Sequence, residues 1–213
     1  NSVTYDSNNN LAYLVGDSGV FGVYDRTSNV TEDLRATDSG DWIGTSSLGS
    51  VVYGSNIKLI YFGGDLGVFG VYNRTSNSTE NLNATDNNNW IGNLLIRGIT
   101  YDSNHDLVYL VGGTIGSGGI FGVYNRTSNS SENLNTTDPG NWILGNWILR
   151  DIAYDSNNDL AYLVGESGAF GVYNRTSNST ENLRGTDTND LVGTSDLQGV
   201  NYDSNNKLVY FIG

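Results

Sequence analysis

Short apolar segments alternate with polar turns along the whole chain. Residues 2–34 read SVTYDS, a polar turn NNN, LAYLVG, DSG, VFGVYD, RTSNVT and EDL. When LAYLVG is extended, Leu11, Tyr13 and Val15 lie on one face, and the apolar residues between them lie on the other. A strand that is apolar on both faces has to be covered on both sides. The pattern therefore predicts short β-strands packed between two layers.

The fourth segment of this unit has a different character. EDLRATD, and ENLNATD further along the chain, each place one leucine among polar residues, as is typical of an edge strand that faces solvent. Three buried strands and one polar outer strand in about 48 residues describe one blade of a β-propeller. Leucine-rich arrays, with about 20–29 residues per repeat, do not match this period.

The unit repeats along the chain. GVYNRTSNSTENL occurs at 70–82 and again at 171–183. The steps between tyrosines of the YDSN type are 48, 48, 53 and 48 residues, counted through Tyr5, Tyr53, Tyr101, Tyr154 and Tyr202. A fixed period of this length is typical of a repeat architecture, in which one continuous array forms.

We predict an all-β fold, a β-propeller-type array of four-stranded antiparallel blades with four full repeats plus a partial fifth. The chain is expected to form a single repeat domain, 1–213. The predicted blades are 2–49, 50–97, 98–150 and 151–198, with a partial blade at 199–213. The partial blade offers only the strands VNYDS and KLVYFIG, so its open edge is a template for strand addition. We expect self-assembly or another chain at this edge, or else a section of a larger propeller.

Two stretches resemble known propeller repeats. SVVYGSNIKLIYFGGDLGVFGVYNRTSN resembles the YVTN repeats of surface-layer proteins, and DWIGTSSLGSVVY is similar to the WIGT stretch of two-component-regulator propellers. The YVTN signature itself is absent, and the fourth repeat has Leu191 where the others have tryptophan. The resemblance implies a propeller fold and an extracellular or cell-surface setting. It implies no ligand and no reaction, because propellers host many functions.

Composition narrows the classes of function. The chain has 213 residues, no cysteine, and a formal net charge of −13. Disulfides and cysteine-based metal sites are therefore excluded, and so acidic a surface disfavours nucleic acid. No apolar run approaches the length of a membrane span, and no signal peptide is recognisable. The start at Asn1 and the absence of methionine indicate a processed or excised piece.

The DSNNN-type turns are candidate cation sites. Oxygen side chains at alternate positions also begin calcium loops, but the glycine and the glutamate of such loops are missing here. Turn chemistry alone explains aspartate and asparagine in a hairpin, so we predict no cofactor, with Ca²⁺ as the alternative. The candidate ligands are Asp102, Asn104, Asp106, Asp155, Asn157 and Asp159.

Charged and aromatic residues recur at fixed places in the repeat. Arginine precedes glutamate by six residues in the pairs Arg26–Glu32, Arg74–Glu80, Arg126–Glu132 and Arg175–Glu181. We expect cross-strand ion pairs in each hairpin, with a ring of arginines around an anion as the alternative. Tryptophans are expected to pack between blades rather than form a platform for sugar. They are Trp42, Trp90, Trp142 and Trp147.

The Asn-X-Ser/Thr pattern marks candidate glycosylation sites. All fall at the hairpin between the third and fourth strands or on the outer strand, where a glycan would be exposed if the protein is exported. The nine acceptors are Asn29, Asn73, Asn77, Asn83, Asn125, Asn129, Asn135, Asn174 and Asn178.

The residues available for catalysis are few. His105 is the only histidine, so a Ser-His-Asp or multi-histidine metal site is not expected. Most acidic residues recur in every repeat, whereas catalytic carboxylates need unlike environments. We therefore predict a non-enzyme, a structural or adhesive propeller outside the cell or at its surface. A ligand-binding propeller for carbohydrate or of the sensor type is the alternative, and a glycosidase-like enzyme is the third.

Overall fold

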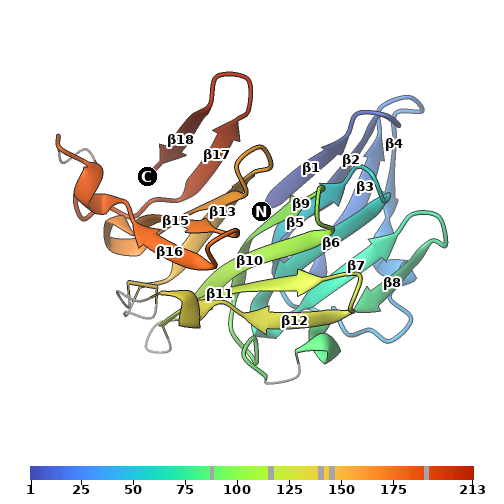
Figure 1. Cartoon of the computed structure of the whole chain (residues 1–213). Helices are drawn as coiled ribbons and strands as arrows, with labels where there is room; N and C mark the ends of the chain where they lie inside the picture. The colour runs from blue at the N-terminus through green and yellow to red at the C-terminus, as the bar shows by residue number, and fades with distance from the viewer. Residues whose placement is uncertain (87–88, 115–117, 139–141, 144–146, 190–191) are drawn as a thin grey trace.

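The structure is a computed structural model that describes the chain apart from residues 87–88, 115–117, 139–141, 144–146 and 190–191. Within the described part, four antiparallel sheets have four strands each, and a fifth has two (Figure 1). In every four-stranded sheet the strands lie in chain order, so each blade is a meander of hairpins. The predicted all-β fold of four blades and a partial fifth is confirmed.

The strands that form each blade are as follows. Blade 1 contains β1 (Ser2–Asp6), β2 (Leu11–Val15), β3 (Phe21–Asp25) and β4 (Val30–Asp33). Blade 2 contains β5 (Leu48–Gly54), β6 (Leu59–Gly64), β7 (Phe69–Asn73) and β8 (Ser78–Asn81). Blade 3 contains β9 (Ile96–Asp102), β10 (Leu107–Thr114), β11 (Gly118–Asn125) and β12 (Ser130–Asn133). Blade 4 contains β13 (Leu149–Asp155), β14 (Leu160–Gly165), β15 (Phe170–Asn174) and β16 (Ser179–Asn182). Blade 5 contains β17 (Gly199–Asp203) and β18 (Leu208–Ile212).

Short 3-10 helices connect the strands. They are η1 (Asp17–Gly19), η2 (Leu34–Thr37), η3 (Asp65–Gly67), η4 (Asn83–Thr85), η5 (Asn135–Thr137), η6 (Glu166–Gly168) and η7 (Arg184–Thr186). Blades 2, 3 and 4 begin at Leu48, Ile96 and Leu149, two residues before the boundaries expected from the repeat. The helices of the described residues are all too short to cross a membrane.

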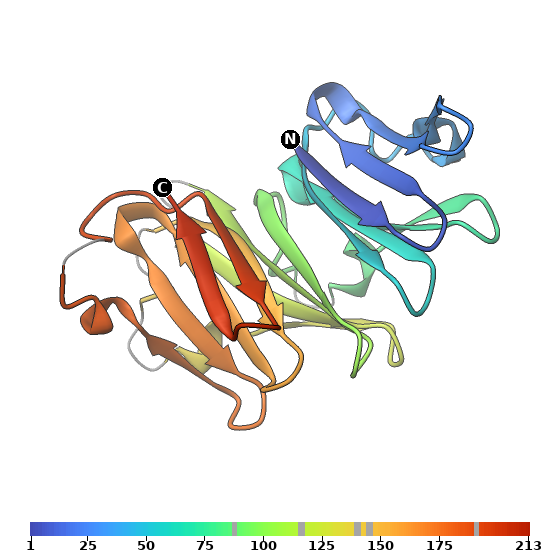
Figure 2. The same ribbon diagram turned by 90° about the horizontal axis from the view of Figure 1, so that it is seen from above.

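The blades follow one another in an open arc (Figure 2). The first strand of each blade is innermost, so β1 lies beside β5, β5 beside β9, β9 beside β13, and β13 beside β17. β1 and β17 stand at the two ends of this arc (Figure 2). The arc therefore has two terminal faces, one on blade 1 and one on blade 5.

The hydrophobic core lies between neighbouring blades. Clusters of buried residues join blade 1 to blade 2, blade 2 to blade 3, blade 3 to blade 4, and blade 4 to blade 5. β6 in blade 2 is buried along its whole length because a blade covers each of its faces, as the apolar pattern predicted. The outer strands β4 and β8 are mostly exposed, as predicted for edge strands.

The hairpin between the first and second strands is fixed by its own polar residues. In blade 1, Asp6 Oδ1 accepts hydrogen bonds from the backbone N–H groups of Asn8 at 3.0 Å and Asn9 at 3.2 Å. Asn10 adopts a left-handed conformation with φ 57°, and its Oδ1 accepts from the Tyr5 hydroxyl at 3.0 Å. The YDSNNN sequence therefore builds a self-bonded turn, which is typical of aspartate and asparagine.

Candidate functional site

Neighbouring blades are joined by a repeated pair of tyrosines. The tyrosine in the second strand of one blade stacks on the YDSN tyrosine of the next. Ring centroids lie 6.2, 6.1, 5.4 and 6.0 Å apart in the pairs Tyr13–Tyr53, Tyr61–Tyr101, Tyr109–Tyr154 and Tyr162–Tyr202. Aromatic pairs at such distances favour association beyond the area they bury. We call each such contact a tyrosine seam.

The aspartate of the YDSN motif also serves the seam. The Tyr53 hydroxyl donates a hydrogen bond to Asp6 of the preceding blade, and burial together with this bond raises the pKa of Tyr53 to about 12. The Tyr154 hydroxyl donates to Asp159 Oδ1 at 3.0 Å in its own hairpin and also contacts Asp102 of the preceding blade. The side chains of Asp6 and Asp102 are completely buried. Repetition of tyrosine and aspartate at this spacing is therefore explained by packing between blades.

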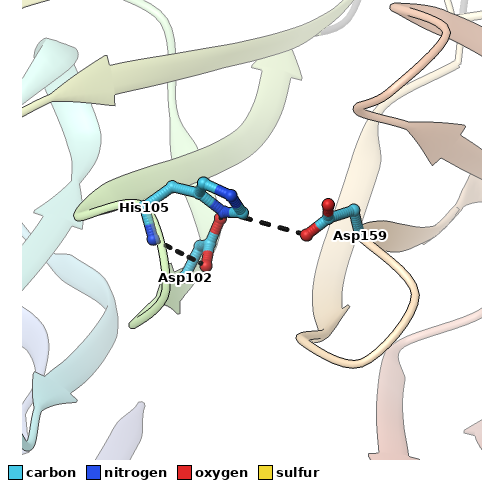
Figure 3. Close-up of side chains that lie close together, drawn as sticks. All are labelled: Asp102, His105 and Asp159. Carbon is cyan, nitrogen blue, oxygen red and sulfur yellow. Dashed lines mark hydrogen bonds and ion pairs between the residues drawn. The ribbon is translucent and has the colours of Figure 1, made fainter.

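One seam brings together three titratable side chains. Asp102 ends β9, His105 lies in the turn that follows, and Asp159 lies in the turn between β13 and β14 (Figure 3). His105 Nδ1 is 2.8 Å from Asp102 Oδ2 and 3.7 Å from Asp159 Oδ1. The two turns meet because β9 and β13 are neighbouring innermost strands. One imidazole and two carboxylates are ligand types that zinc accepts.

The bonding around His105 is nevertheless that of an ordinary turn. Asp102 Oδ1 accepts from the backbone N–H of Asn104 at 2.9 Å and of His105 at 3.3 Å. In blade 1 the equivalent contact is made by Asn9, whose Nδ2 donates to Asp6 Oδ2 at 2.7 Å. His105 thus occupies the place of an asparagine and satisfies the buried carboxylate in the same way.

The other predicted cation ligands do not converge on this group. Asp106 Oδ2 accepts from Arg126 at 2.8 Å, and Asn104 Nδ2 donates to a backbone carbonyl across the seam at 2.8 Å. Asp155 Oδ1 accepts from the backbone N–H of Asn157 at 2.9 Å. Of the four predicted carboxylates, only Asp102 and Asp159 lie together in the described residues. The many oxygen ligands that Ca²⁺ takes are thus not gathered by these turns.

The predicted pairing of arginine with glutamate across one hairpin is wrong. Strand pairing places Glu80 opposite Val71, whereas Arg74 lies beyond the last pair of the ladder. Arginines contact aspartates instead, in the pairs Arg74–Asp6 at 3.3 Å, Arg126–Asp106 at 2.8 Å and Arg175–Asp159 at 4.0 Å. The turn residues carry each arginine out of register with its own glutamate.

Tryptophans pack between blades, as predicted. The Trp42 ring stacks on Phe62 of blade 2, with centroids 5.7 Å apart and planes inclined by 11°. Trp142 is buried, and it lies against Gly171 of blade 4. Trp147 is half-buried beside the core between blades 3 and 4. Leu191, which replaces tryptophan in the fourth repeat, lies outside the described residues.

Most predicted glycosylation acceptors lie on the hairpin rim, but one does not. The residues Asn29, Asn77, Asn129 and Asn178 are exposed, and Asn73, Asn83, Asn125 and Asn174 are half-buried. Asn135 is only 6% exposed, because its Oδ1 accepts from Phe121 N and its Nδ2 donates to Gly119 O. The prediction that all acceptors are exposed is therefore wrong for Asn135.

Sequence reasoning missed a cavity of about 560 Å³ at the innermost ends of the blades. Its lining includes Arg97 and Arg150, and Arg150 Nη2 lies 2.5 Å from Glu166 Oε1. Burial and the nearby charge of Arg150 lower the pKa of Arg97. The signal was in the sequence, because the residue four places before each YDSN tyrosine is not constant across the repeats, and only the third and fourth have arginine there. These residues are Asn1, Gly49, Arg97, Arg150 and Gln198.

The terminal faces of the arc expose apolar side chains whose equivalents in the interior blades are buried or half-buried. On blade 1 they are Val3, Tyr5 and Val20, and on blade 5 they are Leu208, Tyr210 and Ile212. Tyr210 occupies the place in β18 that Tyr13 has in β2, and Tyr5 occupies the place of Tyr53. Each end therefore carries one half of a tyrosine seam.

Comparison with known proteins supports the fold through one structural likeness. No protein-family model and no curated protein matches the chain. Among solved structures, the chain is similar to one from a crystal structure of a nidogen–laminin complex, with a TM-score of 0.70. The match has 12% sequence identity and covers 99% of this chain and 70% of that chain. The matched structure is a β-propeller, so the class of fold defined by the blades is that of a propeller.

Proposed function

We propose that this protein is a non-catalytic propeller that acts outside the cell as a structural or adhesive module. We further propose that its copies join head to tail. One observation carries the proposal: the two ends of the arc hold the unpaired halves of the contact that joins every neighbouring pair of blades. Tyr5 is 47% exposed at one end and Tyr210 is 53% exposed at the other.

The chemistry of the two ends is complementary. Leu208 and Ile212 flank Tyr210 in the way that Leu11 and Val15 flank Tyr13, which stacks on the next blade. Asp203 would accept from the Tyr5 hydroxyl of a second copy as Asp6 accepts from Tyr53. Burial of each large apolar side chain contributes about 1.5–3 kcal/mol. Because unlike faces meet, the contact closes into a ring or propagates as a filament.

Two further observations support the role and its setting. The structural neighbour comes from a complex between nidogen and laminin, which is an interaction between proteins. The exposed Asn-X-Ser/Thr motifs on the rim suit an exported protein. The resemblance to surface-layer repeats points in the same direction.

Sedimentation velocity over a range of concentrations tests the assembly. Tyr5→Asp and Tyr210→Asp each block one end, so either variant alone should sediment as a monomer. Their equimolar mixture retains one intact end on each partner and should form a dimer and no larger species. Leu66→Asp, at an exposed apolar residue of blade 2, is the control and should assemble like the parent. A parent protein that is monomeric throughout, or a mixture that forms no dimer, would refute head-to-tail joining.

A further inference from the structure

Each seam between complete blades contains a crevice near the hairpin of the third and fourth strands. The volumes are about 270 Å³ between blades 1 and 2, 460 Å³ between blades 2 and 3, and 360 Å³ between blades 3 and 4. Cavities of about 300 Å³ and above are of the size that small ligands occupy. The three crevices occupy equivalent positions, and the middle one is described first; the crevice between blades 1 and 2 differs because Asp25 and Val30 line it where Asn73 and Ser78 line the middle one.

Blade 2 provides the floor and one wall of the middle crevice. Tyr61, Val71 and Glu80 form a row of directly paired residues across β6, β7 and β8. The next row on the same face of the sheet lies nearer the hairpin and ends at Ser78. All four residues line the crevice. An apolar floor thus leads to a carboxylate and a hydroxyl at the outer edge.

Blade 3 provides the opposite wall with Tyr124, Arg126 and Asn129. Arg126 Nη1 is held by Asp106 at 2.8 Å, which leaves other N–H donors of the guanidinium free to bind a ligand. The Tyr124 hydroxyl donates to Asn129 Oδ1 at 2.9 Å, so the Nδ2 of Asn129 remains a donor. This wall is therefore rich in hydrogen-bond donors.

The carboxylate on the first wall faces this donor wall in every crevice. After burial, the charge of Glu80 is the largest cause that raises the pKa of Tyr124. Glu32 acts on Tyr72, and Glu132 acts on Tyr173, in the same way. Within the described residues these three glutamates have no hydrogen-bond or ion-pair partner in the protein. Each crevice therefore presents an unused acceptor opposite a set of donors.

We propose that each crevice binds one unit of a neutral saccharide, and that the three crevices together hold one polysaccharide. Adjacent hydroxyl groups of a sugar both donate and accept hydrogen bonds, which matches a glutamate on one wall and an arginine on the other. The apolar floor suits the C–H face of a sugar ring. Each arginine is already paired with an aspartate, so the glutamate leaves the crevice with a net negative charge, and a neutral ligand is favoured over an anion.

The same geometry favours binding over hydrolysis. Glu80 and Glu132 are the only carboxylates among the described residues that line the second and third crevices, whereas glycoside hydrolysis takes a pair. The first crevice also contains Asp25, whose Oδ1 accepts from the backbone N–H groups of its own turn. Repetition adds affinity, because a polymer bound in one crevice is held near the next. The repeated GVYNRTSNSTENL segment lines the crevices from both sides, which accounts for its recurrence at exposed positions.

Blade 4 provides a matched control. Tyr162, Val172 and Glu181 form the same row across β14, β15 and β16. Blade 5 consists of β17 and β18 alone, so no strand equivalent to β11 brings an arginine to face Glu181. Loss of Glu181 should therefore leave saccharide binding unchanged.

Affinity electrophoresis in gels that contain dextran, mannan, galactan or xylan tests the proposal. All variants in this experiment also carry Tyr5→Asp, which blocks head-to-tail joining. Each protein molecule then presents the same three crevices. We expect retardation in at least one gel, and about fivefold weaker retardation for Glu80→Gln, because a neutral amide oxygen replaces the charged acceptor. Combined Glu32→Gln, Glu80→Gln and Glu132→Gln should abolish retardation, whereas Glu181→Gln should not change it. Free migration of the parent in all four gels, or an equal effect of Glu181→Gln, would overturn the proposal.

Discussion

The indole of Trp42 occupies the space in which a side chain on Gly70 would stand. A β-carbon on Gly70 would lie 2.1 Å from the Trp42 ring. The relationship recurs at the next two seams, where the distances are 2.0 Å for Gly122 with Trp90 and 2.3 Å for Gly171 with Trp142. In blades 2, 3 and 4, the glycine of the FGVY strand thus leaves the space that the preceding blade's tryptophan fills.

Gly70→Ala should therefore destabilise the protein by about 1–3 kcal/mol, the usual cost of overpacking a filled core. The measurement is the free energy of unfolding in urea. Gly22→Ala is the matched control, because its β-carbon would meet the Glu32 carbonyl oxygen at 3.0 Å and no indole. An equal loss in the free energy of unfolding for the two substitutions would show that contact with the tryptophan is not the cause.

The fold could be predicted because every repeat carries the same pattern of strands. The period, the apolar character of both faces of β6 and the polar outer strands together indicate stacked four-stranded sheets. Partners across a seam could not be predicted in the same way, because the register between blades has no local signal. For that reason the sequence predicts a pair between Arg74 and Glu80, whereas Arg74 contacts Asp6 in the structure, and the crevices between blades cannot be predicted from one blade alone.

The tyrosine seams make stability sensitive to alkaline pH. The pKa of Tyr53 is raised from 10.0 to about 12, so the folded protein keeps a proton that the unfolded chain releases. The contribution of Tyr53 to the free energy of unfolding is therefore fully present below its ordinary pKa of 10.0. It is lost as the pH rises from about 10 toward 12. Tyr53→Phe removes this contribution and should make the fall shallower in urea titrations at about pH 9, 10 and 11. A slope as steep as that of the parent would contradict the assignment.

His105 should be replaceable by the residue whose place it takes. In the next blade, Asn158 Nδ2 donates to Asp155 Oδ2 at 2.6 Å, as His105 Nδ1 contacts Asp102 Oδ2 at 2.8 Å. His105→Asn should keep the free energy of unfolding within about 0.5 kcal/mol, whereas His105→Ala should cost about 1 kcal/mol for the lost bond to a buried carboxylate.

The same pair of variants separates a turn residue from a metal ligand. If the imidazole serves only the turn, zinc added to the parent and to His105→Asn should shift the urea midpoint equally. A midpoint that rises with zinc in the parent alone would show that Asp102, His105 and Asp159 hold the metal, since ligand binding to the folded state stabilises it.

The position of an acceptor asparagine decides whether it can carry a glycan in an exported protein. Asn77 is exposed, and it has a left-handed conformation with φ 51°; its Oδ1 accepts from the Tyr72 hydroxyl, so its Nδ2 remains available for a glycan. Asn135 has the same acceptor pattern, but its Nδ2 is committed to Gly119 O at 3.0 Å. Protein secreted from a eukaryotic host should therefore carry glycan at Asn77 and none at Asn135, as measured by mass spectrometry of peptides. Acceptor asparagines can be modified before folding is complete, and a glycan at Asn135 should then lower the yield of folded protein. Asn135→Gln removes the acceptor but should not restore the yield, because the longer side chain cannot keep both hydrogen bonds of Asn135. Efficient modification of Asn135 in well-folded protein would contradict the buried position of this residue.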